Sequence, residues 1–333
     1  MTEIFRLDDI QRALETVDVV GDIEAGFVAY SRGEVVVPPV GELLFEEPRG
    51  EAHIKYGYIR NDDYFVIKVA SGFYDNHKLG LPTNFGLMLL FSQKTGELVA
   101  VLLDEGILTG ERTAAAGAVA AKYLAPDFVE RIGVLGTGDQ ARRQLRYLRG
   151  VVDCRDVLIH GRSAEKAAAC KRDVEPLGYT VETTLDAGEV GATCNLIVTV
   201  TPSRQPLLKG ADIRPGTHIT AVGSDTPDKQ ELDPAILAAA DIVVADSIAQ
   251  CRTRGEIYQA MAAGLLDEDD VVELGNVIAH EELRRASDEQ ITVADLTGVA
   301  VQDVQIAKAI YTSLRLMEDS APCDHGRHED TTT

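Results

Sequence analysis

The sequence has no tryptophan, few aromatic residues and no apolar run long enough to cross a membrane. Aromatic residues make up 5% of the 333 positions. Residues 1–10 carry Glu3, Asp8 and Asp9 where a secretory signal would need an apolar stretch. We therefore expect a protein that has no membrane span and works in the cytoplasm.

Cysteine is also scarce, and its spacing argues against two common uses. The total is odd, and no two cysteines form a C-x-x-C pair. Reduced thiols fit this pattern better than a disulfide framework. Metal-ligating residue types do not cluster at ligand spacing either, so no metal site is expected. The cysteines are Cys154, Cys170, Cys194, Cys251 and Cys323.

Positive charge is the third deficit. The 32 Lys and Arg residues are outnumbered by 54 Asp and Glu residues, which gives a formal net charge of −22. Phosphate backbones and anionic lipids require a basic surface, so neither nucleic acid nor a membrane is an expected partner. A hydrophobic content of 45% is ordinary for a globular protein, and this length favours two domains.

The N-terminal part predicts an α+β arrangement with a largely antiparallel sheet. Helical patterns cover residues 8–14 and 19–30, and the Pro38–Pro39 pair breaks the pattern. An alanine-rich helix runs from Gly110 to about Tyr123, with Thr109 as its expected N-cap. Strand-like segments precede that helix at His53–Tyr58, Tyr64–Val69, Leu87–Ser92 and Val99–Leu103.

After Pro126 the pattern changes to alternating strands and helices, which is typical of a parallel sheet with helical crossovers. From Gly298 to about Met317 the pattern is helical again, and a polar tail that we expect to be flexible follows. The expected strands are Arg131–Leu135, Asp156–His160, Asn195–Val200, His218–Val222, Asp241–Ala245 and Ile291–Ala294.

A glycine-rich turn between a strand and a helix is the sharpest local signal. Gly136 permits the tight turn, Gly138 lets the backbone approach a pyrophosphate, and Ala141 allows the helix to pack closely on the strand. The helix N-terminus then offers free N–H groups to the anion. The turn predicts a bound dinucleotide, and the alternative is a purely structural turn.

The end of the second strand of this region bears on the choice of dinucleotide. An acidic residue there would bind the ribose hydroxyls of NAD, but the sequence has His160, Gly161, Arg162 and Ser163. Arg162 and Ser163 could hold a 2′-phosphate, which favours NADP(H) over NAD(H). The alternative is that Arg162 is a solvated loop residue.

Two later strand ends should meet at the same edge of the sheet, where ligands bind in open α/β folds. One strand ends at Thr199–Pro202 and the next at Ala221–Pro227. Asp225 therefore lies where a nicotinamide ring and a substrate would meet, and its carboxylate suits general acid/base work. The alternative is an Asp that only begins a turn.

Two cations of the N-terminal part are candidate ligands for a substrate anion. Lys68 lies within an apolar strand, so it marks either a sheet edge or a site. Arg112 lies in the expected first turn of the Thr109 helix, where a cation is unfavourable unless an anion binds beside it. Each could equally be a surface charge.

Taken together, the motifs resemble the ornithine cyclodeaminase/μ-crystallin family over roughly residues 1–318. The segment Phe73–Pro82 also looks like the branch associated with ectoine degradation. One departure is the missing arginine that many members carry a short way after the second helix. Residues 35–44 hold no Arg; Arg49 is nearby, and Glu42 could hold a substrate amine instead. The matching segments are Phe65–Lys68, Lys78–Pro82, Thr109–Ala116, Gly136–Gln140, Ala221–Asp225, Lys229–Leu232 and Asp295–Asp303.

The resemblance implies a Rossmann domain at residues 126–298, inserted into a substrate-binding and dimerisation domain of residues 1–125 and 299–320. It leaves 321–333 as the tail. It further implies that Lys68 and Arg112 clamp a substrate carboxylate, that Asp225 and Lys68 are catalytic, and that the protein is a homodimer. The expected cofactor contacts are Gly136, Thr137, Gly138, Asp139, Gln140, Arg162, Ser163, Thr199, Val200, Thr201, Val222, Gly223 and Ser224.

The expected reaction is hydride exchange between a nicotinamide and the α-carbon of a small amino acid. Hydrolysis of the resulting imine would make the protein an amino-acid dehydrogenase, and the reverse direction an imine reductase. Attack by a side-chain amine, with return of the hydride, would make it a cyclodeaminase. A non-catalytic binding protein, as in some members of the family, is the remaining alternative.

Overall fold

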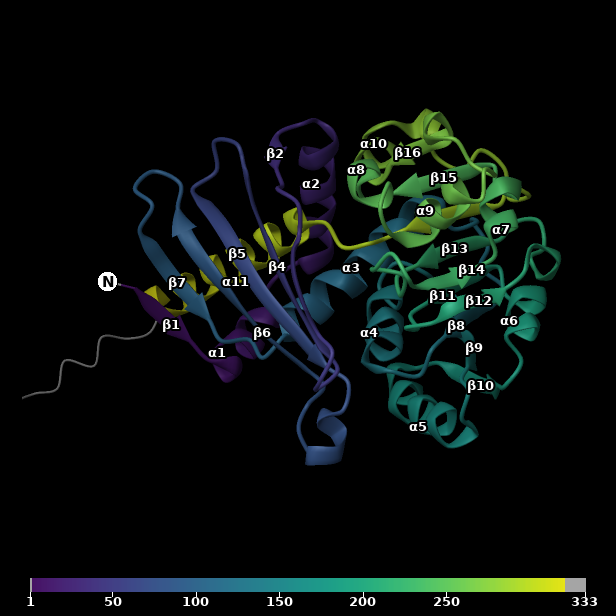
Figure 1. Ribbon diagram of the computed structural model, residues 1–333, viewed down its shortest axis with the longest axis horizontal. Helices are drawn as coiled ribbons and strands as arrows, with labels where there is room; N and C mark the ends of the chain where they lie inside the picture. The colour runs from purple at the N-terminus through teal and green to yellow at the C-terminus, as the bar shows by residue number, and fades with distance from the viewer. Residues whose placement is uncertain (1, 321–333) are drawn as a thin grey trace, which may run out of the picture.

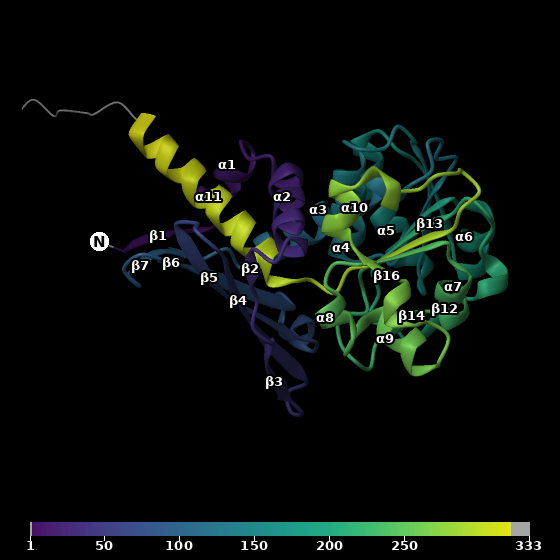
Figure 2. The same ribbon diagram turned by 90° about the horizontal axis from the view of Figure 1, so that it is seen from above.

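The computed structural model describes residues 2–320, and it contains two main β-sheets that lie side by side (Figure 1). Two long helices, α3 (Ile107–Leu124) and α11 (Ala300–Ser320), lie between or beside them and connect the two parts (Figure 2). No helix within the described residues is long and apolar enough to cross a membrane. The tail predicted at 321–333 lies outside the described residues.

The first sheet has seven strands in the order β1-β7-β6-β5-β4-β2, with β3 also paired to β4. Its pairs are antiparallel except that β1 runs parallel to β7. The strands are β1 (Glu3–Phe5), β2 (Val35–Val36), β3 (Gly41–Phe45), β4 (Gly50–Ile59), β5 (Tyr64–Phe73), β6 (Asn84–Ser92) and β7 (Leu98–Leu102).

One face of this sheet is covered by helices and holds the core of the N-terminal part. Side chains alternate across a strand, so Val66 and Lys68 of β5 point to the covered face and are buried. Cross-strand partners continue this buried row from Lys68 to Met88 and Leu102. The covering helices are α1 (Leu7–Leu14), α2 (Val19–Ser31), α3 and α11.

The second sheet has eight strands, all parallel, in the order β10-β9-β8-β11-β13-β17-β15-β16. Its central strands are buried along their whole length, as expected for a parallel sheet with helices on both faces. The strands are β8 (Ile132–Leu135), β9 (Asp156–His160), β10 (Thr180–Thr184), β11 (Leu196–Thr199), β13 (His218–Ala221), β15 (Ile242–Ala245), β16 (Val271–Glu273) and β17 (Thr292–Asp295).

The helices of this part follow the strands in the order expected for crossover connections. A separate two-stranded parallel sheet, β12 (Arg204–Leu208) with β14 (Gln230–Leu232), lies beside the main sheet. The helices are α4 (Asp139–Leu148), α5 (Ala164–Val174), α6 (Ala187–Thr193), α7 (Pro234–Ala239), α8 (Ile248–Cys251), α9 (Gly255–Ala262) and α10 (Leu274–Ala279).

The strand order reverses between β8 and β11. From β8 the chain adds β9 and β10 on one side, and it then returns to add β11 and β13 on the other. The helices that follow such neighbouring strands leave in opposite directions, which opens a crevice at the carboxyl ends of the strands. The first sheet faces this crevice, so a ligand there would touch both parts of the chain.

The α/β fold class predicted from the sequence is confirmed, including the parallel sheet and the largely antiparallel sheet beside it. The six strands predicted for the parallel sheet are present within one or two residues of their expected ends. The strands β10 and β16 were missed. Both lie at the ends of the sheet: β10 has exposed polar residues such as Glu182 that interrupt the apolar pattern, and β16 has only three residues.

The predicted N-cap Thr109 is wrong. Helix α3 begins at Ile107, and the Asp104 carboxylate accepts a hydrogen bond from the N–H of Leu108 at 3.0 Å. Asp104 therefore does the work expected of Thr109, which lies inside the helix and accepts from the Thr113 hydroxyl through its carbonyl. Arg112 consequently lies in the second turn of α3 and not in the first.

Candidate active site

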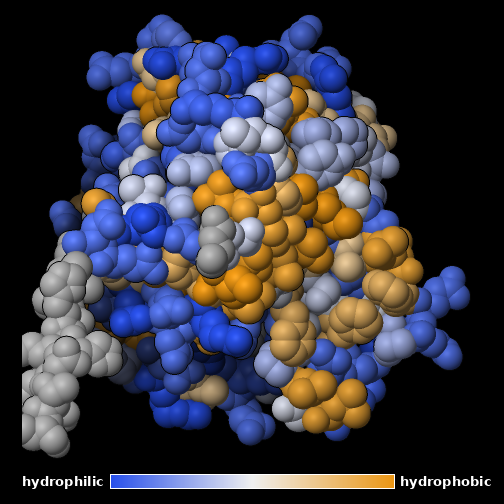
Figure 3. Space-filling view, turned by 90° about the vertical axis from the view of Figure 1, so that its left-hand side faces the viewer, coloured by the Kyte–Doolittle hydropathy of each residue, from blue (hydrophilic) through white to orange (hydrophobic). Residues whose placement is uncertain are grey.

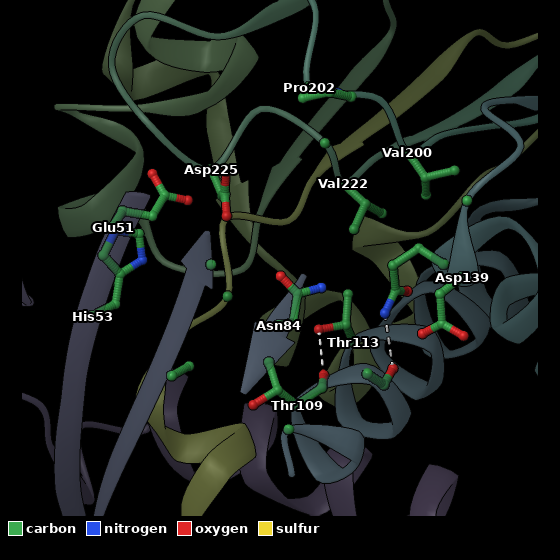
Figure 4. Close-up of a pocket in the computed structure, with 18 of the residues that line it drawn as sticks. Glu51, His53, Asn84, Thr109, Thr113, Asp139, Val200, Pro202, Val222 and Asp225 are labelled. Atoms are coloured by element: carbon green, nitrogen blue, oxygen red, sulfur yellow. Dashed lines mark hydrogen bonds between the residues drawn. The ribbon is translucent and has the colours of Figure 1, made fainter. Parts of the chain in front are cut away.

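A cavity of about 420 Å³ lies between the two sheets, at the crevice where the strand order reverses. Its walls come from β4, β5, β6 and α3 on one side and from the loops after β8, β11, β13 and β17 on the other (Figure 4). Seven predicted site residues from the Rossmann part line it: Gly138, Asp139, Gln140, Val200, Thr201, Val222 and Gly223. Lys68, Arg112 and Asp225 line it as well.

The glycine turn after β8 has the shape that a pyrophosphate requires. Gly136 has φ +131°, and a Cβ there would come within 3.0 Å of the Val200 carbonyl oxygen. A Cβ on Gly138 would meet no atom within 4 Å, so the backbone faces open space. No side chain caps the N-terminus of α4, and its first N–H groups are free to donate to an anion.

Side chains around the turn hold it in place. Arg142 donates to the carbonyl oxygens of Thr137 and Gly138 at 2.7 and 2.9 Å. Gln140 donates to the Gly110 carbonyl at 3.1 Å, while its own side-chain oxygen is buried without a partner. The turn is thus preformed, and these features fit a dinucleotide.

A second cavity, of about 220 Å³, continues from the turn past the end of β9. Gly136, Thr137 and Arg162 line it, and no Asp or Glu is among its lining residues. His160 is buried at its wall, and its Nδ1 has no hydrogen-bond partner. The position suits the adenosine half of a dinucleotide, and Arg162 is exposed beside it.

A buried group of positive charges forms the opposite wall of the main cavity. Lys68 Nζ and Arg112 Nε both donate to one oxygen of Asp303 on α11, each at 3.1 Å. Arg112 also donates to the Gln302 side-chain oxygen at 2.8 Å. Lys55 is the cross-strand partner of Lys68 and donates to the Gly298 carbonyl at 2.6 Å.

This group, which we call the cation cluster (Lys55, Lys68, Arg112 and Asp303), has three basic residues and one acidic residue. All four side chains are buried. Burial lowers the pKa of Lys68 to about 7 even though Asp303 opposes that shift. Burial and the neighbouring Arg112 lower the pKa of Lys55 to about 8. A second anion, such as a substrate carboxylate, would relieve this crowding of positive charge.

Arg112 was expected to mark an anion site because a cation is unfavourable at the start of a helix. The structure places it one turn further along and pairs it with Asp303. Its local anion is therefore a carboxylate of the protein itself, which the sequence argument did not anticipate. Because three cations surround that one carboxylate, the cluster retains positive charge that an anionic ligand can neutralise.

Asp225 follows β13 and faces the cavity, and 42% of its side chain is exposed. Its Oδ1 accepts a hydrogen bond from Lys229 Nζ at 2.6 Å. Burial opposes ionisation of Asp225, but Lys229 and then Lys55 outweigh it and hold the pKa of this carboxyl below its usual value. Asp225 is thus a carboxylate at neutral pH, ready to accept a proton.

The remaining wall is polar and comes from β4 and β6. Glu51 and His53 lie beside Asp225 in Figure 4, and Asn84 lies opposite them. Burial lowers the pKa of His53, so the ring is neutral at neutral pH, and its Nε2 is buried without a partner. These side chains offer hydrogen bonds to a polar part of a substrate.

Five of the predicted or discussed residues are not brought to either cavity. Thr199 and Ser224 are fully buried behind the loops, and Ser163 caps α5 by accepting from the N–H of Lys166. Glu42 pairs with Arg254 at 2.9 Å, and the exposed Arg49 approaches Asp75 to 3.9 Å. None of these is among the lining residues.

The sequence did not single out four of the lining residues, Lys55, Glu51, His53 and Asn84, and Lys55 is the one that belongs to the cation cluster. A signal existed, because Lys55 falls two residues after His53 in a segment predicted as a strand, so both side chains share one face. The sequence does not, however, reveal the strand register that pairs Lys55 with Lys68. Lys55 is therefore the basic residue of the N-terminal strands that lies beside Lys68 and Arg112.

Comparison with known protein families gives a match over almost the whole chain. The model of the ornithine cyclodeaminase/mu-crystallin family matches residues 2–318. An uncharacterized cyclodeaminase of Sinorhizobium fredii is 42% identical over 275 residues, which cover 82% of this chain and 83% of the relative. The alanine dehydrogenase of Archaeoglobus fulgidus is 36% identical over 311 residues, covering 93% and 94%.

Solved structures agree in fold over the same extent. The Δ1-pyrroline-2-carboxylate reductase of Thermococcus litoralis, solved with NADH and L-proline, has a TM-score of 0.89 at 28% identity, covering 95% of this chain and 98% of that one. An archaeal alanine dehydrogenase dimer with bound NAD scores 0.87 at 35% identity, covering 95% and 97%. The iminosuccinate reductase of Paracoccus denitrificans with NAD⁺ scores 0.86 at 32% identity, covering 95% and 97%.

Proposed function

The chain belongs to the ornithine cyclodeaminase/mu-crystallin family, and from this premise we propose that it is an NAD(P)-dependent oxidoreductase of small amino acids or their imines. One observation carries the proposal: a preformed pyrophosphate turn, a surplus of buried cations and an ionised aspartate all face one cavity. Cofactor binding requires the turn, binding of the substrate carboxylate requires the cations, and proton transfer requires the aspartate.

The dinucleotide would lie along the carboxyl ends of β8, β9, β11 and β13. The turn Gly136–Gln140 would hold its pyrophosphate, and Val200, Thr201, Val222 and Gly223 would form the wall beside its nicotinamide. When bound, the nicotinamide supplies or accepts the hydride. Of the other predicted contacts, Thr199 and Ser224 would act only through these loops.

The cation cluster would bind the substrate carboxylate. Arg112 and Lys68 are held in place by Asp303, so little side-chain freedom is lost when a ligand binds. We propose that Lys55 takes the part of the arginine that is missing from residues 35–44, because its ammonium lies in the same cluster. The substrate α-carbon would then face the nicotinamide wall.

Asp225 would move the proton that accompanies the hydride. As a carboxylate it can accept a proton from the substrate nitrogen or from water during oxidation, and it returns that proton in the reverse direction. Lys68, with a pKa of about 7, is a second group able to hold or release a proton near neutral pH. No metal is required in this scheme.

A second candidate reaction is redox-neutral cyclodeamination of a diamino acid. Glu51 lies on the wall beside Asp225, and its carboxylate could hold the side-chain amine before that amine attacks the imine. The same dinucleotide turn, cation cluster and Asp225 would serve this reaction. The two candidates therefore differ in substrate and product and not in the site.

We propose NADP(H) as the preferred cofactor. The adenosine cavity contains Arg162 and no carboxylate to bind ribose hydroxyls, and a 2′-phosphate would gain a charge-assisted hydrogen bond from Arg162. The structural relatives above were solved with NAD, NAD⁺ or NADH, so this preference would set the chain apart from them. Equal or better KM for NAD(H) would defeat it.

We also propose that the protein is a homodimer joined through the uncovered face of the first sheet. Cross-strand partners form one apolar row on that face, and Figure 3 shows a broad hydrophobic area on this side of the molecule. Exposed apolar areas of this kind mark association surfaces. Residues 2–125 with 299–320 would then form the dimerisation and substrate domain. The row is Tyr56, Ile67, Leu89, Val101 and Ile4.

The test is a paired screen with wild-type protein. NADP⁺ or NAD⁺ with a panel of amino acids, and NADPH or NADH with imines formed from keto acids and ammonia, are followed by nicotinamide absorbance. Parallel samples with diamino acids are assayed for ammonia and cyclic product. Turnover in either arm supports the proposal, and dinucleotide binding without turnover in any arm would instead indicate a binding protein.

A further inference from the structure

A fully buried glutamate, Glu231 on β14, lies directly behind the proposed nicotinamide wall. One of its carboxylate oxygens accepts hydrogen bonds from the N–H and the hydroxyl of Thr201, at 2.6 and 2.7 Å. The other accepts from the Thr199 hydroxyl at 2.7 Å and from the Gly223 N–H at 2.9 Å. One carboxylate thus receives four donors.

These donors come from two different loops. Thr199 and Thr201 belong to the end of β11 and the loop after it, whereas Gly223 follows β13. Thr201 and Gly223 both line the main cavity, so the loops form neighbouring parts of the same wall. A Cβ on residue 223 would lie 2.2 Å from the Thr201 carbonyl oxygen and 2.6 Å from the Glu231 carboxylate. The two loops therefore touch, and Glu231 is their common partner.

The arrangement suits a charged carboxylate, since four donors occupy its four lone-pair positions. An amide in its place would bring an N–H against the N–H of Thr201 or of Gly223, whichever oxygen it replaced. Within residues 2–320 no cation pairs with Glu231. Glu256 of α9 lies behind it and accepts from the N–H groups of Glu231 and Leu232 at 2.7 and 3.1 Å.

The charged groups around Glu231 are few. Glu256 faces it from α9, and Asp295 of β17 lies behind Glu256. Lys229 precedes Glu231 but pairs with Asp225, and Arg204 of β12 pairs with Asp228. Burial raises the pKa of Glu231 to about 7 although its hydrogen bonds oppose the shift. The carboxylate therefore titrates near neutral pH.

We propose that Glu231 is a positioning residue for the cofactor: as an anion, it fixes the loops after β11 and β13 in the joint conformation that receives the nicotinamide half of the dinucleotide. It touches neither cavity itself. The inference rests on the proposed function, because it assumes that this wall binds a dinucleotide. Loss of its charge would loosen both loops at once and weaken cofactor binding.

The direct test is the dissociation constant of NADH and NADPH, measured by fluorescence titration without substrate. Glu231→Gln should weaken binding of both by about tenfold or more, in line with the loss of hydrogen bonds to a charged group. Glu231→Asp retains the charge and should recover part of the affinity. With NADH, wild-type binding should weaken as the pH falls below 7, and the Gln variant should lose this dependence.

Asn195→Ala is the matched control, because Asn195 is also buried but accepts from the N–H groups of Glu130 and Arg131 at the amino ends of the strands, away from both loops. It should lower the melting temperature yet leave the dissociation constants within about twofold. Equal weakening in both variants, or none in Glu231→Gln, would overturn the inference.

Should Glu231→Gln not fold, Thr199→Val removes one donor to Glu231 at a buried position that lines neither cavity. A severalfold weakening of NADH binding supports the inference, and unchanged binding overturns it. Wild-type protein that binds neither dinucleotide would refute the proposed function itself. If the wild-type protein binds the dinucleotides and the variants bind them equally well, only the role of Glu231 is refuted.

Discussion

Lys229 Nζ lies 2.6 Å from Asp225 Oδ1, so the proposed proton carrier is held as a carboxylate by a lysine four residues away. Burial alone would raise the pKa of Asp225, and the charge of Lys229 is the largest effect that lowers it. The pair explains how a group in a cavity between two sheets can stay ionised at neutral pH.

Replacing Lys229 with Gln should therefore move the acidic limb of the pH profile of kcat/KM to higher pH. The variant removes the charge that lowers the pKa of Asp225, so the carboxyl stays protonated over a wider range and cannot act as a base there. Lys209→Gln, at an exposed position of the same part of the chain, is the control. An unmoved acidic limb would mean that Asp225 is not the titrating base.

Asp225→Asn should lower kcat by at least about 100-fold, because an amide cannot carry the proton. Binding of NADH should stay within about threefold of wild type, since the turn and the adenosine cavity are untouched. Asp228→Asn is the matched control, because Asp228 lies in the same loop but is exposed and pairs with Arg204. A kcat close to wild type in Asp225→Asn would remove Asp225 from the mechanism.

Arg112→Ala should raise KM for the amino acid by about 10- to 100-fold, the range expected for loss of a hydrogen bond to a charged group of about 1.5–3 kcal/mol. The change in kcat should be smaller, because Arg112 binds the carboxylate and not the reacting atoms. Arg146→Ala on α4, half exposed and outside the cluster, serves as control. An unaltered KM would place the substrate carboxylate elsewhere.

Substrate affinity should fall as the pH rises through 7 to 8. The pKa values of Lys68 and Lys55 are lowered to about 7 and about 8, so both ammonium groups lose their protons in this window. A carboxylate binds the protonated lysines, which makes binding strongest below pH 7 and weaker above 8. The dissociation constant of a non-reacting carboxylate such as propionate, titrated against pH, checks this directly, and a flat profile would contradict it.

Ile67→Glu should convert a dimer into monomers. Ile67 lies in the middle of the apolar row on the uncovered sheet face, between Tyr56 and Leu89, and a charge there would be buried without a partner on association. Sedimentation velocity measures the change. Thr95→Glu in the β6–β7 turn is the control and should remain dimeric. A monomeric wild-type protein would show the proposed interface to be wrong.

Much of the fold could be predicted because the strands of the parallel sheet are continuous apolar segments bounded by turn residues. The glycine turn was equally predictable, since Gly136 and Gly138 are required by the local backbone conformation and not by contacts with distant segments. Polar edge strands such as β10 carry no comparable pattern. The start of α3 was misplaced because Asp104, three residues before the helix, and not Thr109, satisfies its N-terminus.

The site was harder to predict because it depends on contacts between distant segments. Lys68 and Arg112 were identified, but their partner Asp303 is separated from them by 235 and 191 residues. Lys55 becomes recognisable only through its pairing with Lys68 across two strands. Glu231 falls in the matching segment Lys229–Leu232, but its role could not be predicted, since a single Glu in a polar segment looks exposed until β14 is placed behind the cofactor wall.

The central claim is that this cavity exchanges hydride with the α-carbon of an amino acid. Transfer of deuterium from an α-deuterated amino acid to the oxidised nicotinamide, followed by mass spectrometry of the reduced cofactor, tests it most directly. The account predicts label in the reduced dinucleotide with wild-type protein and almost none with Asp225→Asn. Reduced cofactor that carries no label would contradict the account, as would failure of every substrate in the panel to react.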